Sequence, residues 1–373
     1  MTVATLSKRF FKKFFLLLFI LCALMTYDLD NIIHQYLPTT SNDMSEDVYA
    51  QLTEFIASDC INLTTVRPTD PSSFNVSNRV HREKSWVNIT PPFHFGSQFG
   101  KGAAPMHMRG DIPYMNLISD YINKNYADCV DCITIDMGAN QGFYTYFLAA
   151  LGMQVHSFEI NDRNFVSLKH GLLFNPTEVS KRVHLYPIGI SDNIGWSSQR
   201  GSGYESYLDK TTTTGSILSI TFDCFVHHTK PKLLNNIPFV KVDVEGYEIA
   251  AIKGTKHSLL HPSIKIGVWF MEVGPSRWDR AGVSLESGIE EMKDLASHFK
   301  ETYIILRGSA SKNCPNSIAD DVGLSDTNPR KLDTIYHIEN LVNHMHKVTL
   351  IELQSLLTHM HEHRTDCNFW FEN

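Results

Sequence analysis

Apolar and polar residues alternate along the middle of the chain with two periods, one typical of strands and one typical of helices. Short runs rich in β-branched and aromatic residues predict buried strands, at Ile133–Ile135, Gln154–Phe158, Val183–Ile190, Ser216–Phe222, Phe239–Val244, Ile264–Phe270 and Thr302–Leu306. Apolar residues at helical spacing predict helices between them, over Ile112–Tyr126, Tyr144–Leu151, Ile249–Gly254, Ser287–Phe299 and Thr349–His361, with another starting at Asn161. This alternation predicts an α/β domain built on a doubly wound, mostly parallel sheet.

Local signals predict several helix starts and one excursion. Ser287 with Glu290, and Thr349 with Glu352, each have the spacing of a capping box at the start of a helix. Residues 194–216 are rich in Gly, Ser and Thr and predict a hairpin or a loop. The last helix should bury five residues: Leu350, Leu353, Leu356, Leu357 and Met360.

The N-terminal residues combine a basic flank with an apolar run. The flank contains four basic residues: Lys8, Arg9, Lys12 and Lys13. The apolar run Phe14–Met25 is shorter than the roughly 20 residues that span a bilayer comfortably, unless flanking lysines extend it by snorkelling. The pattern is typical of a cleaved signal peptide or of an uncleaved signal anchor, and no clean small-x-small cleavage site follows. Because the basic flank comes first, the positive-inside rule places the rest of the chain in the lumen.

We therefore predict three regions along the chain. Residues 1–27 form a cytoplasmic tail and signal anchor, residues 28–100 a lumenal stem, and residues 101–373 the folded domain. This describes a single-pass type II membrane protein of the Golgi or endoplasmic reticulum, or a secreted protein if the N-terminus is cleaved. The stem is polar and carries three N-x-[ST] sequons, at Asn62, Asn75 and Asn88, which we expect to be glycosylated.

Charge and cysteine content exclude several classes of protein. The chain has 373 residues and is 43% hydrophobic, which suffices for a large core. Its net charge is −7 and no basic cluster lies outside the N-terminus, so we predict no nucleic-acid partner. Seven cysteines are too few for a disulfide scaffold. Cys129 and Cys132 precede a strand rather than open a helix, which favours a structural disulfide or a buried thiol over a redox pair.

The stretch Asp136–Gly142 has the composition of a nucleotide-cofactor turn. It joins the strand Ile133–Ile135 to a helix that should open just after Gly142. A dinucleotide site has glycines spaced G-x-G-x-x-G, whereas Gly138 and Gly142 are four apart with Asn140 between them. The acid before the first glycine would repel a pyrophosphate and attract the ammonium and sulfonium charges of S-adenosylmethionine.

Two motifs resemble those of the FkbM family of S-adenosylmethionine-dependent methyltransferases. The first is D-x-G-A-N-x-G at Asp136–Gly142, and the second is K-V-D-V-E-G-Y-E at Lys241–Glu248, followed by A-x-x-G. The I-T-F-D element ending at Asp223 also resembles the family. The resemblance implies a class I methyltransferase fold of Rossmann-like type, S-adenosyl-L-methionine as cofactor, and functional roles for the acids of the second motif.

The cofactor contacts are expected at the strand ends. In the first motif we predict five cofactor-binding residues: Asp136, Gly138, Ala139, Asn140 and Gly142. Glu159 follows the second strand, about 20 residues after the glycine turn, and is placed to accept two ribose hydroxyls, although a solvated strand-end acid would look the same. Ile190 is a candidate to pack on the adenine ring, and Ser191 or Asp192 to reach its amino group.

The end of the fourth strand carries the predicted catalytic acids. Methyl transfer is an in-line displacement that depends on holding acceptor and methyl group together, and a hydroxyl acceptor also calls for a base. Asp243 lies where ligands bind in such sheets, beyond the carboxyl ends of the strands, so we predict Asp243 and Glu245 as catalytic residues. Glu248 fits either a functional role or a cap of the next helix. Lys241 should point to the opposite face from its apolar neighbours and pair with an acid.

Metal-binding patterns are weak. Asp243 and Glu245 lack a third ligand at a known spacing. His359 and His363 share a helix face, but solvent-facing histidines explain them as well, so we predict no metal.

The sequence thus predicts a membrane-anchored, lumenal methyltransferase that acts on a hydroxyl of a glycan or small molecule. One alternative is a catalytically inactive methyltransferase-fold module that binds glycan or protein, and another is a nucleotide-dependent enzyme of Rossmann type. The first is disfavoured by the intact acids and glycines of the two motifs. The second is disfavoured by the absence of the third-glycine pattern.

Overall fold

The computed structural model describes residues 83–87, 92–97, 103–129, 132–201, 206–209, 217–228, 236–260, 264–307, 314–332 and 343–373. The chain divides into two units, Met1–Thr53 and Glu54–Asn373, and all described residues belong to the second. The predicted anchor, most of the predicted stem and the three sequons lie outside the described residues. None of the helices in the described ranges has the length and apolar content needed to cross a membrane.

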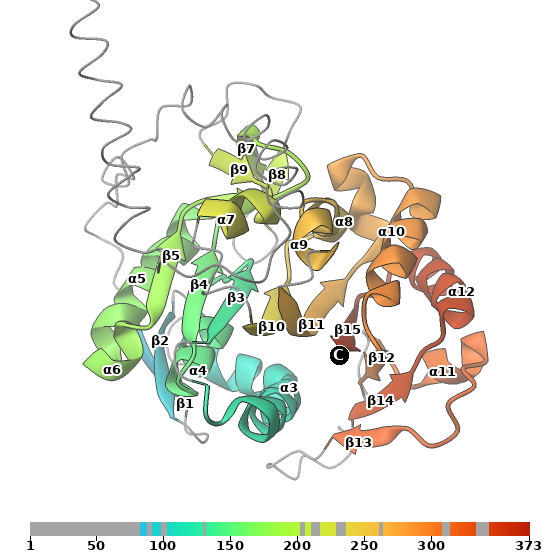
Figure 1. The fold of residues 1–373 in the computed structure, drawn as a ribbon, viewed down its shortest axis with the longest axis horizontal. Coiled ribbons are helices and arrows are strands. Elements are labelled where there is room, and N and C mark those ends of the chain that lie inside the picture. The colour runs from blue at the N-terminus through green and yellow to red at the C-terminus, as the bar shows by residue number, and fades with distance from the viewer. Residues whose placement is uncertain are drawn as a thin grey trace, which may run out of the picture. The chain divides into compact units, whose positions relative to one another are not determined.

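A nine-stranded sheet forms the centre of the described part of the chain (Figure 1). Its strands are β3 (Ile133–Met137), β4 (Gln154–Phe158), β5 (Val183–Tyr186), β10 (Asn236–Val242), β11 (Lys265–Val273), β12 (Glu301–Leu306), β13 (Arg330–Leu332), β14 (Asn343–Lys347) and β15 (Cys367–Glu372). They lie in the order β13-β14-β12-β15-β11-β10-β3-β4-β5. The five neighbouring strands from β5 to β11 are parallel, which confirms the predicted doubly wound sheet.

The direction in which successive strands are added reverses beside β3. The chain runs outward from β3 through β4 to β5, then returns to place β10 on the other side of β3 and continues to β11. In open α/β sheets, ligands bind at such a switch point, in the crevice beyond the carboxyl ends of the strands. The loops after β3, β4 and β10 therefore surround the expected crevice.

Helices cover both faces of the sheet (Figure 1). They are α3 (Ala103–Tyr126), α4 (Phe143–Ala150), α5 (Asp162–Phe174), α6 (Thr177–Ser180), α7 (Phe222–His228), α8 (Glu248–Lys253), α9 (Lys256–Leu260), α10 (Leu285–Ser297), α11 (Ser317–Val322), α12 (Leu350–Glu362) and the 3-10 helix η5 (Pro275–Ala281). Alternate strand residues enter two cores: Val240 and Val242 pack with residues of α8, α10 and α12, whereas Phe239 packs with residues of α3 and α4. Since side chains alternate along a strand, Lys241 falls on the α3 and α4 face.

A smaller sheet lies beside the crevice. The predicted strand Val183–Ile190 divides at Pro187, which lacks the N–H that a ladder requires. Its first half is β5, and its last residues form β6 (Gly189–Ile190), which pairs with β9 (Ile217–Ile220). The excursion predicted for residues 194–216 contains an antiparallel hairpin of β7 (Gly195–Arg200) and β8 (Tyr207–Asp209).

Folded structure also lies within the segment predicted to be stem. The strands β1 (Glu83–Val87) and β2 (Phe93–Ser97) form an antiparallel pair. Phe93 is fully buried against Phe143 and Phe147 of α4, and the backbone of His94 exchanges two hydrogen bonds with the Asn175 side chain. The packed domain therefore includes residues before position 100.

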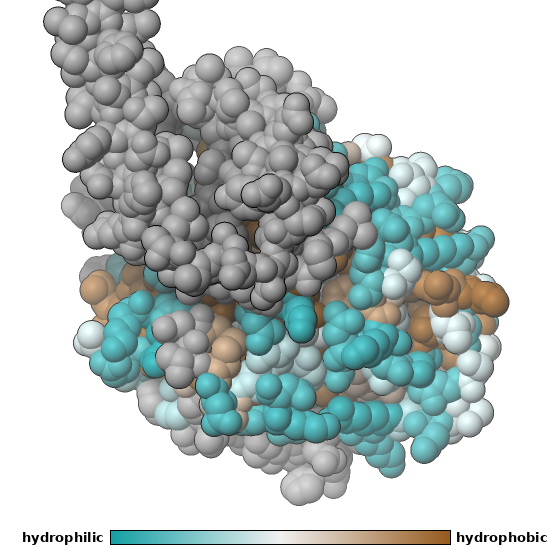
Figure 2. Space-filling model, viewed as in Figure 1, coloured by the Kyte–Doolittle hydropathy of each residue, from teal (hydrophilic) through white to brown (hydrophobic). Residues whose placement is uncertain are grey.

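The two predicted capping boxes have different outcomes. Thr349 and Glu352 form the predicted box at the start of α12. The box predicted for Ser287 and Glu290 is wrong, because α10 begins earlier and Ser284 accepts a hydrogen bond from the Ser287 N–H. Four of the five residues expected to be buried by α12 are buried, but Leu350 in its first turn is 47% exposed. Figure 2 shows a hydrophobic area over α12 in a largely hydrophilic surface.

The sequence patterns missed β15, the strand at the C-terminus. This strand lies antiparallel between β11 and β12, and five of its six residues are buried. A strand buried on both faces shows no alternation, so a short one at a chain end gives little periodic signal. Cys367 at its start is disulfide-bonded to Cys314.

Cys129 is disulfide-bonded to Cys132. Of the two states predicted for Cys129 and Cys132, the structural disulfide is therefore confirmed.

Candidate functional site

A cleft with an empty volume of about 550 Å³, partly open to solvent, lies at the switch point between β3 and β10. Six of the predicted site residues line it: Gly138, Asn140, Glu159, Ile190, Asp243 and Glu245. They come from the ends of β3, β4, β6 and β10, so segments more than a hundred positions apart form one cleft. Five other predicted residues are not part of this lining: Asp136, Ala139, Gly142, Ser191 and Asp192.

The glycine turn passes very close to the end of β10. Gly138 has a φ of +79°, and a Cβ atom built on it would lie 1.8 Å from the backbone oxygen of Asp243. The Gly138 and Ala139 amides both donate to the Phe158 carbonyl at the end of β4. Gly138 is therefore required by the contact between two strand ends, and the close approach brings Asp243 to the cleft.

Glu159 joins the glycine turn to the start of α5. One of its carboxylate oxygens accepts the Asn140 N–H at 2.7 Å, and the other accepts the Asn161 N–H at 2.7 Å. Glu159 is only 6% exposed, which excludes the alternative of a solvated strand-end acid. Burial raises the pKa of Glu159 to about 7, because desolvation outweighs the two amide hydrogen bonds that favour the charged form.

Asp136 lies behind the cleft rather than in its wall. Its carboxylate is fully buried, accepts the Thr145 hydroxyl at 2.6 Å and lies 3.4 Å from the Lys241 ammonium. Asp136 and Lys241 are register partners on adjacent parallel strands, and both point to the α4 face. The pairing expected for Lys241 is thus confirmed, and Lys241 lies between Asp136 and the cleft residue Asp243.

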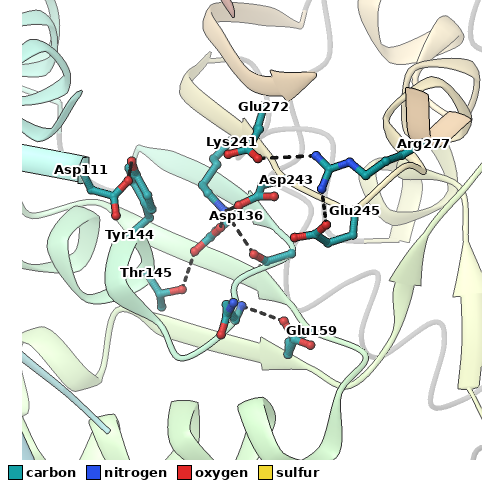
Figure 3. A network of polar contacts seen from close by, with 12 residues as sticks. Asp111, Asp136, Tyr144, Thr145, Glu159, Lys241, Asp243, Glu245, Glu272 and Arg277 are labelled. Carbon is teal, nitrogen blue, oxygen red and sulfur yellow. Dashed lines mark hydrogen bonds and ion pairs between the residues drawn. The ribbon is translucent and has the colours of Figure 1, made fainter. Parts of the chain in front are cut away.

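Lys241 also contacts Asp243, which lines the cleft (Figure 3). Its Nζ lies 3.4 Å from Asp243 Oδ2, donates to the Gly138 carbonyl at 3.1 Å and lies 5.2 Å from the centre of the Tyr144 ring. Burial alone would lower the pKa of Lys241, but Asp243 and Asp136 outweigh burial and raise it. Lys241 is therefore a charged, buried partner of both acids.

Arg277 of η5 organises the acids beyond Asp243. Its guanidinium lies 2.5 Å from Glu245, 3.5 Å from Glu272 and 3.4 Å from Asp366. Glu245 follows β10, Glu272 lies near the end of β11, and Asp366 precedes β15. Glu245 has a φ of +56°, which is uncommon for a residue other than glycine. A second arginine, Arg280, donates to the Glu245 backbone oxygen at 3.0 Å, so two arginines hold this conformation.

This cluster contains more carboxyl groups than cations, so ionisation of all the carboxyl groups at once is unfavourable. Burial and the nearby Asp243 raise the pKa of Glu245 and of Glu272 to about 8. Burial raises the pKa of Glu248 to about 7, and its carboxylate accepts the Gly246 N–H at 2.7 Å. Glu248 is fully buried and absent from the cleft lining, so the predicted capping role fits its position better than ligand contact.

The apolar end of the cleft is built from strand ends on the β6 side. Ile190 lines it together with Phe158, Ile160 and Leu208. Ser191 is fully buried, its N–H donates to the Ile220 carbonyl of β9, and its hydroxyl donates to the Asp192 carboxylate. The structure therefore brings Ile190 to the cleft, while the proposed adenine contacts of Ser191 and Asp192 remain predictions without support from the lining.

Sequence reasoning missed Arg277 and Asp366. Arg277 lies in a short 3-10 helix after β11, and Asp366 precedes the strand that was missed altogether. Neither residue belongs to a recognisable motif, so only the sheet order, with β15 next to β11, brings them to Glu245. The strand ends carry more acids than bases, and buried acids need a positively charged partner, so this excess indicated that a cation such as Arg277 lies nearby.

The described residues contain no group of three or more His, Cys, Asp or Glu side chains arranged to hold a metal. His359 and His363 do share a face of α12, with ring centroids 4.0 Å apart. His359 lies 3.8 Å from Asp321.

The sheet order, its reversal beside β3 and the cleft at that point define a class I, Rossmann-like methyltransferase fold. Residues 136–305 match the family model described as the methyltransferase FkbM domain, the family whose motifs the sequence resembles. No curated protein matches the chain.

Solved structures that are similar to this chain include three methyltransferases. The METTL16 methyltransferase domain is 11% identical over 64% of this chain and 66% of that domain, with a TM-score of 0.31. The human methyltransferase 10 domain containing protein is 10% identical over 66% of this chain and 83% of that one, with a TM-score of 0.30. The glycopeptide N-methyltransferase MtfA complexed with sinefungin is 10% identical over 68% of this chain and 85% of that one, with a TM-score of 0.25.

Proposed function

We propose that the cleft binds S-adenosyl-L-methionine and that the protein methylates a hydroxyl of a glycan or small molecule in the secretory pathway. The observation that carries this proposal is the composition of one cleft in the FkbM domain. Glu159 and apolar residues line one part of it, and the acids Asp243 and Glu245 line another. No nucleic-acid acceptor is proposed, because the chain carries a net charge of −7.

The residues present fit this cofactor. Glu159 can accept hydroxyl hydrogen bonds through its remaining lone pairs, and Ile190 and Leu208 offer an apolar surface to an aromatic ring. Asn140 Oδ1 is buried and has no hydrogen-bond partner among the described residues, so the cleft holds an acceptor that a ligand can satisfy. The acids at the other end suit ammonium and sulfonium charges and disfavour a pyrophosphate, which counts against the dinucleotide alternative.

The reaction assigns separate tasks to the residues of the cleft. The bound cofactor supplies a methyl group activated by the sulfonium. Asp243, 32% exposed at its side chain, is placed to orient an acceptor hydroxyl and to take its proton. Glu245 is held by Arg277 and Arg280 and shapes the wall beside Asp243. The inactive binding module is disfavoured because cofactor and catalytic residues of both motifs lie in a single cleft.

Placement in the secretory pathway is supported by the disulfides and by the N-terminal sequence. The bonds Cys129–Cys132 and Cys314–Cys367 persist in oxidising compartments and are rare in the cytosol. The basic flank, apolar run and sequons point the same way. We propose a type II membrane protein with its catalytic domain in the lumen.

We expect the purified chain to bind S-adenosylhomocysteine and not NAD in isothermal titration. Glu159→Ala should weaken S-adenosylhomocysteine binding at least about tenfold, because a buried charged hydrogen bond is lost. A matched control is Glu178→Ala, since Glu178 is a surface residue of α6 paired with Lys181. Binding of NAD, or unchanged S-adenosylhomocysteine affinity in Glu159→Ala with the fold intact, would contradict the site.

The same titration should depend on pH. Glu159 accepts hydroxyls best when ionised, and its pKa is raised to about 7 by burial. Affinity should therefore increase as pH rises from 6 to 8 and decline as pH falls through 7. Glu159→Gln should bind weakly throughout and lose most of this dependence, so an unaltered pH profile in that variant would assign the titration to another group.

Expression in eukaryotic cells should add glycan at Asn62, Asn75 or Asn88. Glycosidase treatment should then increase gel mobility, and a variant with all three residues changed to Gln should show no shift. A cytosolic protein without any shift would refute the lumenal placement and leave the methyltransferase proposal intact.

A further inference from the structure

Lys241 is a buried cation that touches both walls of the cleft. It is 5% exposed, and its Nζ lies 3.1 Å from the Gly138 carbonyl and 3.4 Å from Asp243 Oδ2. Gly138 and Asp243 both line the cleft, one in the glycine turn and the other beyond β10. Gly138 and Lys241 are 103 positions apart in the sequence, so a single ammonium connects distant parts of the chain at the site.

Three oxygens lie within 3.4 Å of the Lys241 ammonium. The ammonium donates a hydrogen bond to the Gly138 carbonyl and forms ion pairs with Asp243 Oδ2 and Asp136 Oδ1, each at 3.4 Å. Tyr144 covers the same ammonium with its ring at 5.2 Å, on the side of α4. Without the cation, the fully buried carboxylate of Asp136 and the partly exposed carboxylate of Asp243 would lie near each other with no positive charge between them, and like charges repel.

We propose that Lys241 is a positioning residue that holds the Asp243 carboxylate and the Gly138 turn at a fixed separation. The cofactor side and the acceptor side of the cleft then keep one relative position, which in-line transfer requires. The roles of the two sides rest on the proposed function, whereas the mechanical connection itself rests on the contacts of Lys241 alone.

A packing role and a positioning role of Lys241 predict opposite rankings of two variants. Methionine is apolar and close to lysine in length, so a role in packing alone is served better by Lys241→Met than by the larger Lys241→Arg. A role that depends on the cation is served better by Lys241→Arg, which keeps the charge. Lys256→Met is a matched control, because Lys256 also bridges two acids, Glu291 at 3.0 Å and Asp294 at 3.5 Å, on the surface.

The test is amide hydrogen exchange of the ligand-free protein, followed by titration with S-adenosylhomocysteine. In Lys241→Met, exchange should accelerate at least about tenfold within residues 136–142 and 243–247 and remain unchanged elsewhere. The affinity for S-adenosylhomocysteine should fall about tenfold. Lys241→Arg should show smaller changes in both measurements, and Lys256→Met should show none.

The proposal is overturned if Lys241→Met keeps the protection of both segments and binds within twofold of wild type, or if it outperforms Lys241→Arg. Should Lys241→Met fail to fold, the double variant Lys241→Met with Asp136→Asn removes one of the two facing charges and takes its place with the same expected outcome. Exchange is measured without ligand, so it tests Lys241 independently of the cofactor. A wild-type protein that does not bind S-adenosylhomocysteine would refute the proposed function and leave the exchange result standing.

Discussion

Asp243→Asn should lower methyl transfer by on the order of a hundredfold or more while the affinity for S-adenosylhomocysteine stays within a few-fold. The substitution preserves shape and removes a negative charge, and a positioned acid–base group contributes roughly 10²–10⁴-fold to rate. Asp243 is the acid of the second motif that is both in the cleft lining and 32% exposed at its side chain, so an acceptor can reach it. Lys241 keeps Asp136 as a partner in this variant, so no buried cation is left unpaired.

The stability of Asp243→Asn should change little or increase. Asp243 raises the pKa of both Glu245 and Glu272, so its removal relieves repulsion among the acids around Arg277. Thermal unfolding of the variant measures this effect separately from turnover. A loss of turnover without a loss of stability would indicate a catalytic rather than a structural role.

The assay starts from labelled S-adenosylmethionine and a lumenal glycan extract, because the acceptor is to be identified. Asp294→Asn on the exposed side of α10 is the control, since Asp294 lies outside the cleft. Full turnover in Asp243→Asn would make the acid structural and move the base to Glu245 or Glu272. Binding of S-adenosylhomocysteine without transfer to any acceptor pool would favour the inactive binding module.

The sequence predicted the part of the site that is local along the chain. A strand, an acid, a spaced pair of glycines and a helix are contiguous, so this order and its resemblance to the first FkbM motif placed Gly138 and Asn140 at the cofactor site. Glu159 and Asp243 were placed because parallel strands end at the same edge of a sheet. In each case the prediction used the strand ends, which are fixed once the strands and their parallel arrangement are known.

The rest of the site depends on contacts that no local pattern specifies. Asp136 is a predicted cofactor residue, and the pleat of β3 turns its side chain to the α4 face, where Thr145 and Lys241 bind it, so its cofactor contact stays a prediction. Arg277 reaches Asp366 only because β15 is inserted beside β11. The predicted adenine contact of Ser191 or Asp192 stays a prediction, because a proline divides the strand and the Ser191 N–H is paired with Ile220 of β9.

Gly138→Ala should destabilise the protein by about 3 kcal/mol or more, the sum of overpacking between two strand ends and a left-handed backbone. The added Cβ would lie 1.8 Å from the Asp243 oxygen and 2.8 Å from its carbonyl carbon, and both are backbone atoms that no rotamer change can move aside. The clash can be relieved only by separating β3 from β10, which also moves Asp243 away from the glycine turn. S-adenosylhomocysteine binding should therefore be lost together with stability.

Gly152→Ala separates the two causes of this loss. Gly152 has a φ of +97°, similar in kind to the +79° of Gly138, but a Cβ atom there would meet nothing within 4 Å. It should cost only about 1–2 kcal/mol, the usual penalty of a left-handed conformation. The difference between the two variants in urea unfolding midpoints measures the clash itself, provided that the slopes of the transitions agree. Equal destabilisation of the two variants would mean that the ends of β3 and β10 lie farther apart than the Gly138–Asp243 contact requires. Asp243 would then not be held beside the glycine turn, and its placement in the cleft would be wrong.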